Sequence, residues 1–75
     1  MIMDSTQNIL IKTPYIQLGQ LLKIVGVIQT GGETKHFLLH THVFVNESQD
    51  QRRGRKLYPG DRVVIRERQF LIQAQ

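Results

Sequence analysis

The spacing of apolar residues changes along this 75-residue chain, and each change predicts a different secondary-structure element. The segment Asn8-Ile9-Leu10-Ile11-Lys12-Thr13 is rich in branched apolar residues and stops at Pro14, which predicts a strand over residues 8–13. Four apolar residues then recur at the i, i+3, i+4 and i+7 positions of one helix face: Leu18, Leu21, Leu22 and Val25. Gly26 follows the last of them, where a helix that ends in a left-handed turn favours a residue without a side chain.

A second helix is predicted to begin at Thr30. The Thr30 hydroxyl can cap this helix while Glu33, three residues later, reaches back to the Thr30 amide. Gly31 and Gly32 then fall in the first turn, although glycine is a poor helix former. Either their free amides offer a seat for a phosphate, or their lack of side chains permits close packing against a neighbouring strand. The buried face of the helix is predicted to consist of Thr34, Phe37, Leu38 and Thr41.

The rest of the chain consists of short apolar segments separated by turn residues. Strands are predicted over residues 43–46, 62–66 and 70–72, and Pro59-Gly60-Asp61 supplies a turn before the second of them. The sequence therefore predicts an α+β fold, in which two packed helices are followed by a small, mostly antiparallel sheet and preceded by an N-terminal strand. A chain of this length is expected to form a single domain over residues 1–75.

The whole chain has a formal net charge of +4, and its positive charge is concentrated in the second half. Residues 51–68 contain seven of the ten lysines and arginines but only two acidic residues. The densest part is Arg52-Arg53-Gly54-Arg55-Lys56, called the basic loop (residues 52–56) below. Four cations within five residues repel one another, so they are expected to have no structural use, whereas an RNA backbone would neutralise them and release counterions. Considered alone, the charges are also compatible with a solvated loop.

Metal chemistry and catalysis find little support in the sequence. His36 and His40 lie one helical turn apart and His42 follows, but no cysteine or nearby acidic residue completes a zinc site. We therefore expect no metal and no cofactor, and either surface histidines or histidines that contact RNA. No nucleophile with a base beside it is apparent, so we expect no enzyme activity. Tyr15 and Tyr58, which both adjoin prolines, could stack on bases or cover the edge of the core.

The sequence contains no signal for membrane insertion or export. No apolar segment approaches the roughly 20 residues that a membrane-spanning helix needs. The first eight residues are polar and include Asp4, which is unlike a secretory signal. We therefore expect a cytoplasmic protein without a membrane partner.

The order of these elements resembles the S4 RNA-binding domain, named after a small-subunit ribosomal protein. The resemblance covers about Tyr15 to Arg66, and its motifs are Leu18, Leu22 and Gly26, then Thr30-Gly31-Gly32-Glu33-Thr34-Lys35, then His42-Val43-Phe44-Val45-Asn46, then Leu57-Tyr58-Pro59-Gly60-Asp61. The fragments Gly-Gly-Glu-Thr-Lys and Arg-Arg-Gly-Arg-Lys-Leu are most similar to a short bacterial branch of stand-alone domains. The family pattern has a basic residue where this chain has Gly31, and a glycine where it has Glu47.

The resemblance implies a binding surface formed by the second helix and the loop into the following strand. Because the family binds structured RNA, commonly ribosomal or transfer RNA, it implies a non-catalytic, ribosome-associated monomer that grips the phosphate backbone, with a ribosomal or other protein as a further partner. The residues expected to contact RNA are Thr30, Gly31, Gly32, Lys35, His36, His40, His42, Arg52, Arg53, Arg55 and Lys56. The alternatives are a protein-docking module on a ribosomal or replication assembly and a protein that binds duplex DNA.

Overall fold

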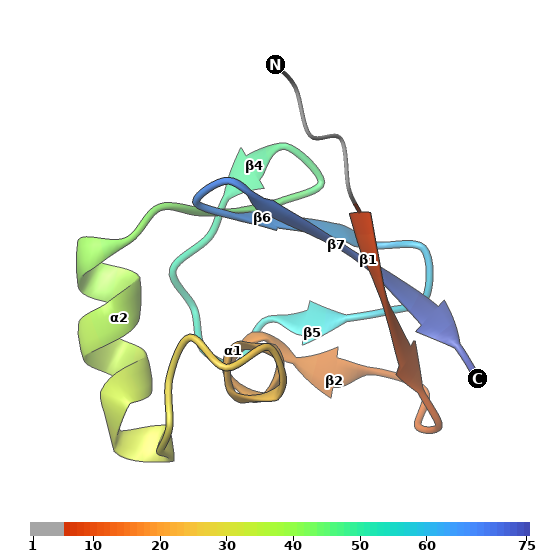
Figure 1. Cartoon of the computed structure of the whole chain (residues 1–75), viewed down its shortest axis with the longest axis horizontal. Helices are drawn as coiled ribbons and strands as arrows, with labels where there is room; N and C mark the ends of the chain where they lie inside the picture. Colours follow the sequence, from red (N-terminus) through yellow and green to blue (C-terminus); the bar gives the residue numbers. More distant parts are fainter. Residues whose placement is uncertain (1–5) are drawn as a thin grey trace.

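Two long strands from opposite ends of the sequence pair with each other in one sheet (Figure 1). The computed structural model describes residues 6–75, so Asp4 and the rest of the polar stretch over residues 1–5 lie outside the described part. β1 (Thr6–Ile11) runs parallel to β7 (Arg68–Ala74), with Ile9 opposite Ile72. This pairing closes the fold around the elements that lie between the two strands in the sequence.

The large sheet is mixed, because β1 is parallel to its neighbour and the other three pairings are antiparallel. Its strand order is β1-β7-β6-β3-β4. Its remaining strands are β3 (Val43–Val45), β4 (Ser48–Gln49) and β6 (Arg62–Ile65). A strand therefore exists at each predicted position, with ends shifted by a few residues, and β4 was not predicted.

A second, two-stranded sheet was also not predicted. β2 (Ile16–Gln17) pairs antiparallel with β5 (Lys56–Leu57), and Ile16 lies opposite Leu57. Strands of two residues are too short for an alternating pattern to reveal them. Two helices and a sheet are present as expected, but the arrangement is more interleaved than helices followed by a sheet. β2 precedes the first helix and connects it to the end of the basic loop.

The first helix confirms its predicted apolar face and its predicted end. α1 (Leu18–Ile24) buries its three leucines completely. Gly26 has a φ of 85°, and its amide donates to the Lys23 carbonyl at 3.1 Å. The Val27 amide donates to the Leu22 carbonyl at 3.1 Å, which completes a Schellman motif. Gly26 is therefore required for the left-handed turn that directs the chain away from α1.

The second helix begins later than predicted. Gly31–Glu33 form a 3₁₀ turn, η1, and α2 (Thr34–His40) follows it. The predicted capping box is wrong, because the Thr30 side chain makes no capping bond and the Glu33 carboxylate accepts from the Gln29 amide at 2.9 Å. The tighter 3₁₀ turn displaces Glu33 from the position that a capping box needs. The predicted buried face is confirmed in full: Thr34, Phe37, Leu38 and Thr41.

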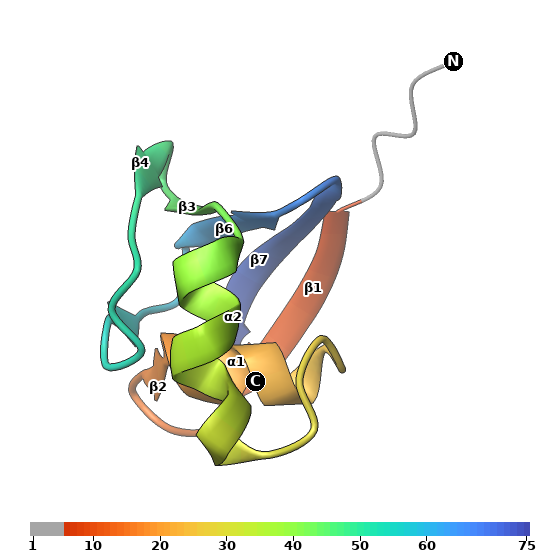
Figure 2. The ribbon, with the colours of Figure 1, turned by 90° about the vertical axis from the view of Figure 1, so that its left-hand side faces the viewer.

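The core lies between the inner face of the large sheet and the layer of α1, β2 and β5, and α2 closes one side (Figures 1 and 2). Alternation along β6 places Val63 and Ile65 in this core and leaves Arg62 exposed on the outer face. Neither helix in the described part of the chain is long and apolar enough to cross a membrane. The elements that flank the basic loop, α1 and α2, are thus both anchored by buried side chains.

The turn between β3 and β4 contains the position where the family pattern has glycine. Asn46 has a φ of 51° and Glu47 a φ of 73°, so two consecutive residues adopt the left-handed conformation of a type I′ hairpin turn. The Asn46 side chain accepts from the Arg62 amide and donates to Asp61, both at 3.0 Å, which supports its unusual backbone. Glu47 forms no such hydrogen bond among the described residues. Within this turn, backbone strain is therefore concentrated at Glu47.

Replacement of Glu47 by glycine should stabilise the fold. The left-handed conformation costs a residue with a side chain about 1–2 kcal/mol, whereas glycine loses about 0.5–1 kcal/mol more conformational entropy on folding. The expected net gain in the free energy of unfolding is about 0.5–1 kcal/mol, measured by urea denaturation. Glu47→Gln removes the charge but keeps the side chain, so it should show no gain. A Glu47→Gly variant no more stable than the parent would contradict this account.

Candidate nucleic-acid interface

The backbone of the basic loop is attached to the first residues of α1. The segment that contains it runs from β4 to β5 along one side of the two helices (Figures 1 and 2). The Leu18 amide donates to the Arg55 carbonyl at 2.8 Å, and the Gly19 amide donates to the Arg53 carbonyl at 2.9 Å. The first amides of a helix have no acceptor within the helix, so these carbonyls satisfy them. The loop is therefore held in place by its backbone while its side chains remain available.

Gly19 lies at the centre of this attachment and was not among the predicted site residues. A Cβ atom at this position would lie 3.4 Å from the Arg53 carbonyl oxygen and 3.4 Å from Cγ2 of Thr34. The backbone of α1, the start of α2 and the basic loop thus meet at one residue. A glycine inside an otherwise amphipathic helix is the signal that could have identified this contact.

Asp50 is the second anchor of the basic loop, and it is only 7% exposed. Its carboxylate accepts three hydrogen bonds from Arg52: from the amide at 2.9 Å, from Nε at 3.0 Å and from Nη2 at 2.8 Å. A fourth bond comes from Nη1 of Arg55 at 2.8 Å. We call Asp50, Arg52 and Arg55 the carboxylate clamp.

The electrostatics of the clamp favour the charged forms of Asp50 and Arg52. The hydrogen bonds from Arg52 hold the pKa of the Asp50 carboxyl well below its usual range, although burial acts in the opposite direction. The same contact raises the pKa of Arg52. The expectation that the four cations have no structural use was therefore wrong for Arg52 and Arg55. The signal was an acidic residue, Asp50, two positions before the basic run.

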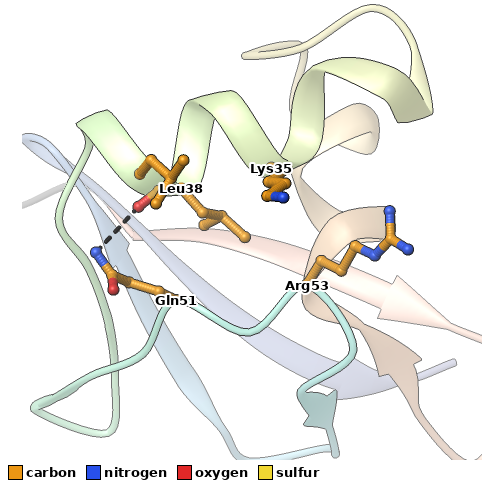
Figure 3. A pocket seen from close by; sticks show the side chains of 5 residues that line it. Lys35, Leu38, Gln51 and Arg53 are labelled. Carbon is orange, nitrogen blue, oxygen red and sulfur yellow. Dashed lines mark hydrogen bonds between the residues drawn. The ribbon is translucent and has the colours of Figure 1, made fainter.

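Arg53 lies between two hollows on the surface. One hollow, of about 410 Å³, lies between α2 and the loop, where Gln51 donates to the Leu38 carbonyl at 3.2 Å (Figure 3). It is lined by Lys35, Leu38, Leu39, Gln51 and Arg53. The second hollow lies between α1, η1 and the loop, and its lining includes Lys23, Gly31, Arg53 and Gly54. The fold thus brings together three of the predicted contact residues, Lys35, Gly31 and Arg53, and adds Lys23, which was not predicted.

Gly31 and Gly32 lie in open space at the start of α2. A Cβ atom on Gly31 would meet nothing within 4 Å, and one on Gly32 would meet only Oγ1 of Thr30 at 3.9 Å. The close packing that the sequence left open as an explanation for these glycines is therefore absent. Among the predicted site residues, Thr30, Gly31 and Gly32 form an exposed and uncrowded backbone segment beside the second hollow.

The three histidines are exposed but do not line either hollow. The rings of His36 and His40 lie 4.4 Å apart, centroid to centroid, and His42 lies 6.5 Å from Phe44 by the same measure. His36 is about 100° further around α2 than Lys35, and His40 is about 100° further than Leu39; Lys35 and Leu39 line the first hollow. No cluster of metal-binding side chains occurs within residues 6–75. His36 and His40 thus lie on a different side of α2 from the residues that line the first hollow.

An aromatic pair adjoins the other end of the basic loop. The Tyr15 and Tyr58 rings are 5.6 Å apart, and Nζ of Lys56 lies 4.9 Å from the centre of the Tyr15 ring. Tyr58 is 47% exposed and lines a shallow hollow together with Arg52, Gly54, Arg55, Lys56 and Asp61. The basic loop therefore meets an aromatic edge where β2 and β5 pair.

An anchored cationic loop beside two short helices and a mixed sheet is the arrangement of a small nucleic-acid-binding domain. The sequence model of the S4 domain family matches residues 9–73, so the chain belongs to this family and the predicted resemblance is confirmed. The match is wider than the predicted range from Tyr15 to Arg66, because it includes the second half of β1 and most of β7.

The chain is also similar to a curated bacterial protein. Its relative is the probable ribosome maturation protein RlbA of Bacillus subtilis (strain 168), with 56% identity over 55 residues. The matched region comprises 73% of this chain and 78% of the relative.

Removal of the clamp carboxylate should destabilise the fold at neutral pH. Asp50→Asn should lower the free energy of unfolding by about 1–3 kcal/mol, because hydrogen bonds to charged groups are lost. The pKa of Asp50 is lower in the folded state than the value of about 3.9 expected for the unfolded chain. Its contribution is therefore complete above that unfolded value and is lost as the pH falls toward the folded value. The difference between parent and variant should narrow below about pH 4.

Urea denaturation across a pH series measures this effect. Glu67→Gln is a matched control, because it makes the same charge change at an exposed residue and should alter stability by less than about 0.5 kcal/mol. Equal stability of the parent and Asp50→Asn at pH 7 would show that the clamp does not stabilise the fold.

Proposed function

We propose that this protein binds structured RNA of the ribosomal or transfer RNA class, without catalysing a reaction, and that it acts in ribosome maturation. Membership of the S4 domain family supports the RNA-binding part of the proposal. The name of the bacterial relative supports the link to ribosome maturation. We further propose a cytoplasmic monomer with a single domain and no cofactor, and a ribosomal protein as a second partner.

The observation that carries the proposal is the attachment of the basic loop to α1. Hydrogen bonds from Leu18 and Gly19 fix the backbone of the loop, and the clamp fixes Arg52 and Arg55. Within the described chain, Arg53 and Lys56 form no ion pair with an acidic side chain. Cations on a fixed backbone suit a ligand whose phosphates are also fixed in space, which is the case in folded RNA.

We propose that the contacts are centred on Arg53. Arg53 lines the first hollow together with Lys35, and it lines the second hollow together with Lys23 and Gly31. Phosphates that follow the path from α2 across the loop would meet these cations in turn. The exposed backbone at Thr30, Gly31 and Gly32 leaves room for a sugar–phosphate chain to approach α2. The histidines would contact RNA only where it extends around the far side of α2.

A salt titration tests the proposal. If about five phosphates are engaged, affinity for folded RNA should fall by roughly 10²–10³ between 50 and 200 mM salt. The double variant Arg53→Glu, Lys35→Glu reverses two charges and should weaken RNA binding at least about tenfold. The slope of log affinity against log salt concentration should become shallower by about 1.5, because two phosphate contacts are lost. Fluorescence anisotropy with labelled RNA measures both. Arg52 and Arg55 are unsuitable for reversal, because a glutamate there would face the buried carboxylate of Asp50.

The control makes the same change of charge away from the loop. Arg62→Glu combined with Lys12→Glu alters one exposed residue on the outer face of the sheet and one beyond β1, and should have a much smaller effect. Duplex DNA and single strands should bind more weakly than folded RNA. Absence of salt-sensitive binding to any folded RNA would favour the protein-docking alternative, and equal effects of the two double variants would move the site elsewhere.

A further inference from the structure

We propose that Asp50 is a positioning residue that makes the basic loop selective for folded RNA over flexible single strands. The inference rests on the proposed function, because it concerns how the same loop recognises its ligand. Asp50 is the only acidic residue that forms ion pairs with the basic loop within the described residues, and it is only 7% exposed. Asp61 also borders the loop, in the shallow hollow beside Tyr58, but it forms no ion pair with it there. On net charge alone, a carboxylate at this place would weaken the attraction between the loop and any phosphate.

The geometry of the clamp shows what this carboxylate contributes. Both oxygens are used, because Oδ1 accepts from the amide and Nε of Arg52, and Oδ2 accepts from Nη2 of Arg52 and Nη1 of Arg55. The Asp50 side chain thus orients two guanidinium groups, and it also holds the backbone between β4 and the basic loop. Asparagine has nearly the same shape, but its amide nitrogen would face a guanidinium donor.

The clamp leaves both arginines able to bind a phosphate. A guanidinium has five N–H donors. Asp50 uses two from the Arg52 guanidinium, and the Arg52 side chain is still 72% exposed. Arg55 gives one donor to Asp50 and a second to the Lys56 carbonyl at 3.3 Å. Three donors therefore remain on each side chain, and their directions are already set before any ligand is present.

Such an arrangement favours a ligand with fixed geometry. Ordering a long side chain on binding reduces affinity, and a side chain that is already ordered avoids most of this loss. A folded RNA presents phosphates at fixed spacing and gains from a loop that matches them. A flexible strand adjusts its own phosphates to either an ordered or a mobile loop, so it gains far less. The clamp therefore contributes to discrimination between RNA shapes as well as to affinity.

Asp50→Asn tests the proposal, because positioning and net charge predict opposite signs. The variant should bind folded RNA roughly tenfold more weakly than the parent, since two arginines must then be ordered on binding. Its affinity for a single strand of equal length, such as oligouridylate, should stay the same or rise. Anisotropy is measured at a temperature where circular dichroism shows both proteins to be folded. Glu67→Gln makes the same charge change at an exposed position and should leave the preference for folded RNA unaltered.

A second variant tests the clamp without changing the charge. Arg52→Lys keeps the cation but loses the paired contact with Asp50, so it should also weaken binding to folded RNA. In the Asp50→Asn background the same substitution should have little further effect, because the clamp is already absent. If Asp50 only supported the fold, the folded fraction of each variant would bind with the affinity of the parent. This variant also decides the question if Asp50→Asn does not fold.

The outcomes separate the two proposals. A parent protein that binds no folded RNA contradicts the proposed function itself. A parent that binds folded RNA, together with an Asp50→Asn or Arg52→Lys variant that binds it as tightly or more tightly, overturns the positioning role of Asp50 and leaves the proposed function standing. An equal loss of affinity for folded RNA and for single strands overturns the selectivity.

Discussion

Two backbone hydrogen bonds, from Leu18 to Arg55 and from Gly19 to Arg53, join α1 to the segment with the densest positive charge. They satisfy helix amides that would otherwise depend on water, and they hold a cationic loop against a buried helix. The backbones approach closely at residue 19, because a Cβ atom there would be in van der Waals contact with both Arg53 and Thr34. The backbone position of the basic loop follows from this attachment.

The charges of the basic loop depend on how Asp50 is buried. A buried carboxylate is unfavourable unless it is hydrogen-bonded and paired, and Asp50 meets both conditions through Arg52 and Arg55. Because the pairing uses only some of the guanidinium donors, the loop is ordered while it remains a surface for anions. In the RNA complex that we propose, structural order and ligand binding would draw on the same two arginines.

Local patterns predicted those features whose cause is local. The buried faces of both helices follow from the spacing of apolar residues, and the end of α1 follows from Gly26. The start of α2 was predicted wrongly, because Thr30-Gly31-Gly32-Glu33 fits a capping box, whereas the chain adopts a 3₁₀ turn there. The two strands of the small sheet have no detectable period, and they form only because Ile16 and Leu57 meet across the fold.

The sequence by itself determined the family, the α+β character, the apolar core faces and the location of the basic loop, because each of these depends on residue order over a short stretch. The tertiary structure alone decided which cations lie together. Lys35, Arg53 and Lys23 come from three different elements, and they share the two neighbouring hollows because α1, α2 and the loop meet at Gly19. It also decided that Asp50 supports the basic loop. Burial and hydrogen-bond partners across the fold, rather than neighbours in the sequence, determine whether an acidic residue opposes a cationic surface or organises it.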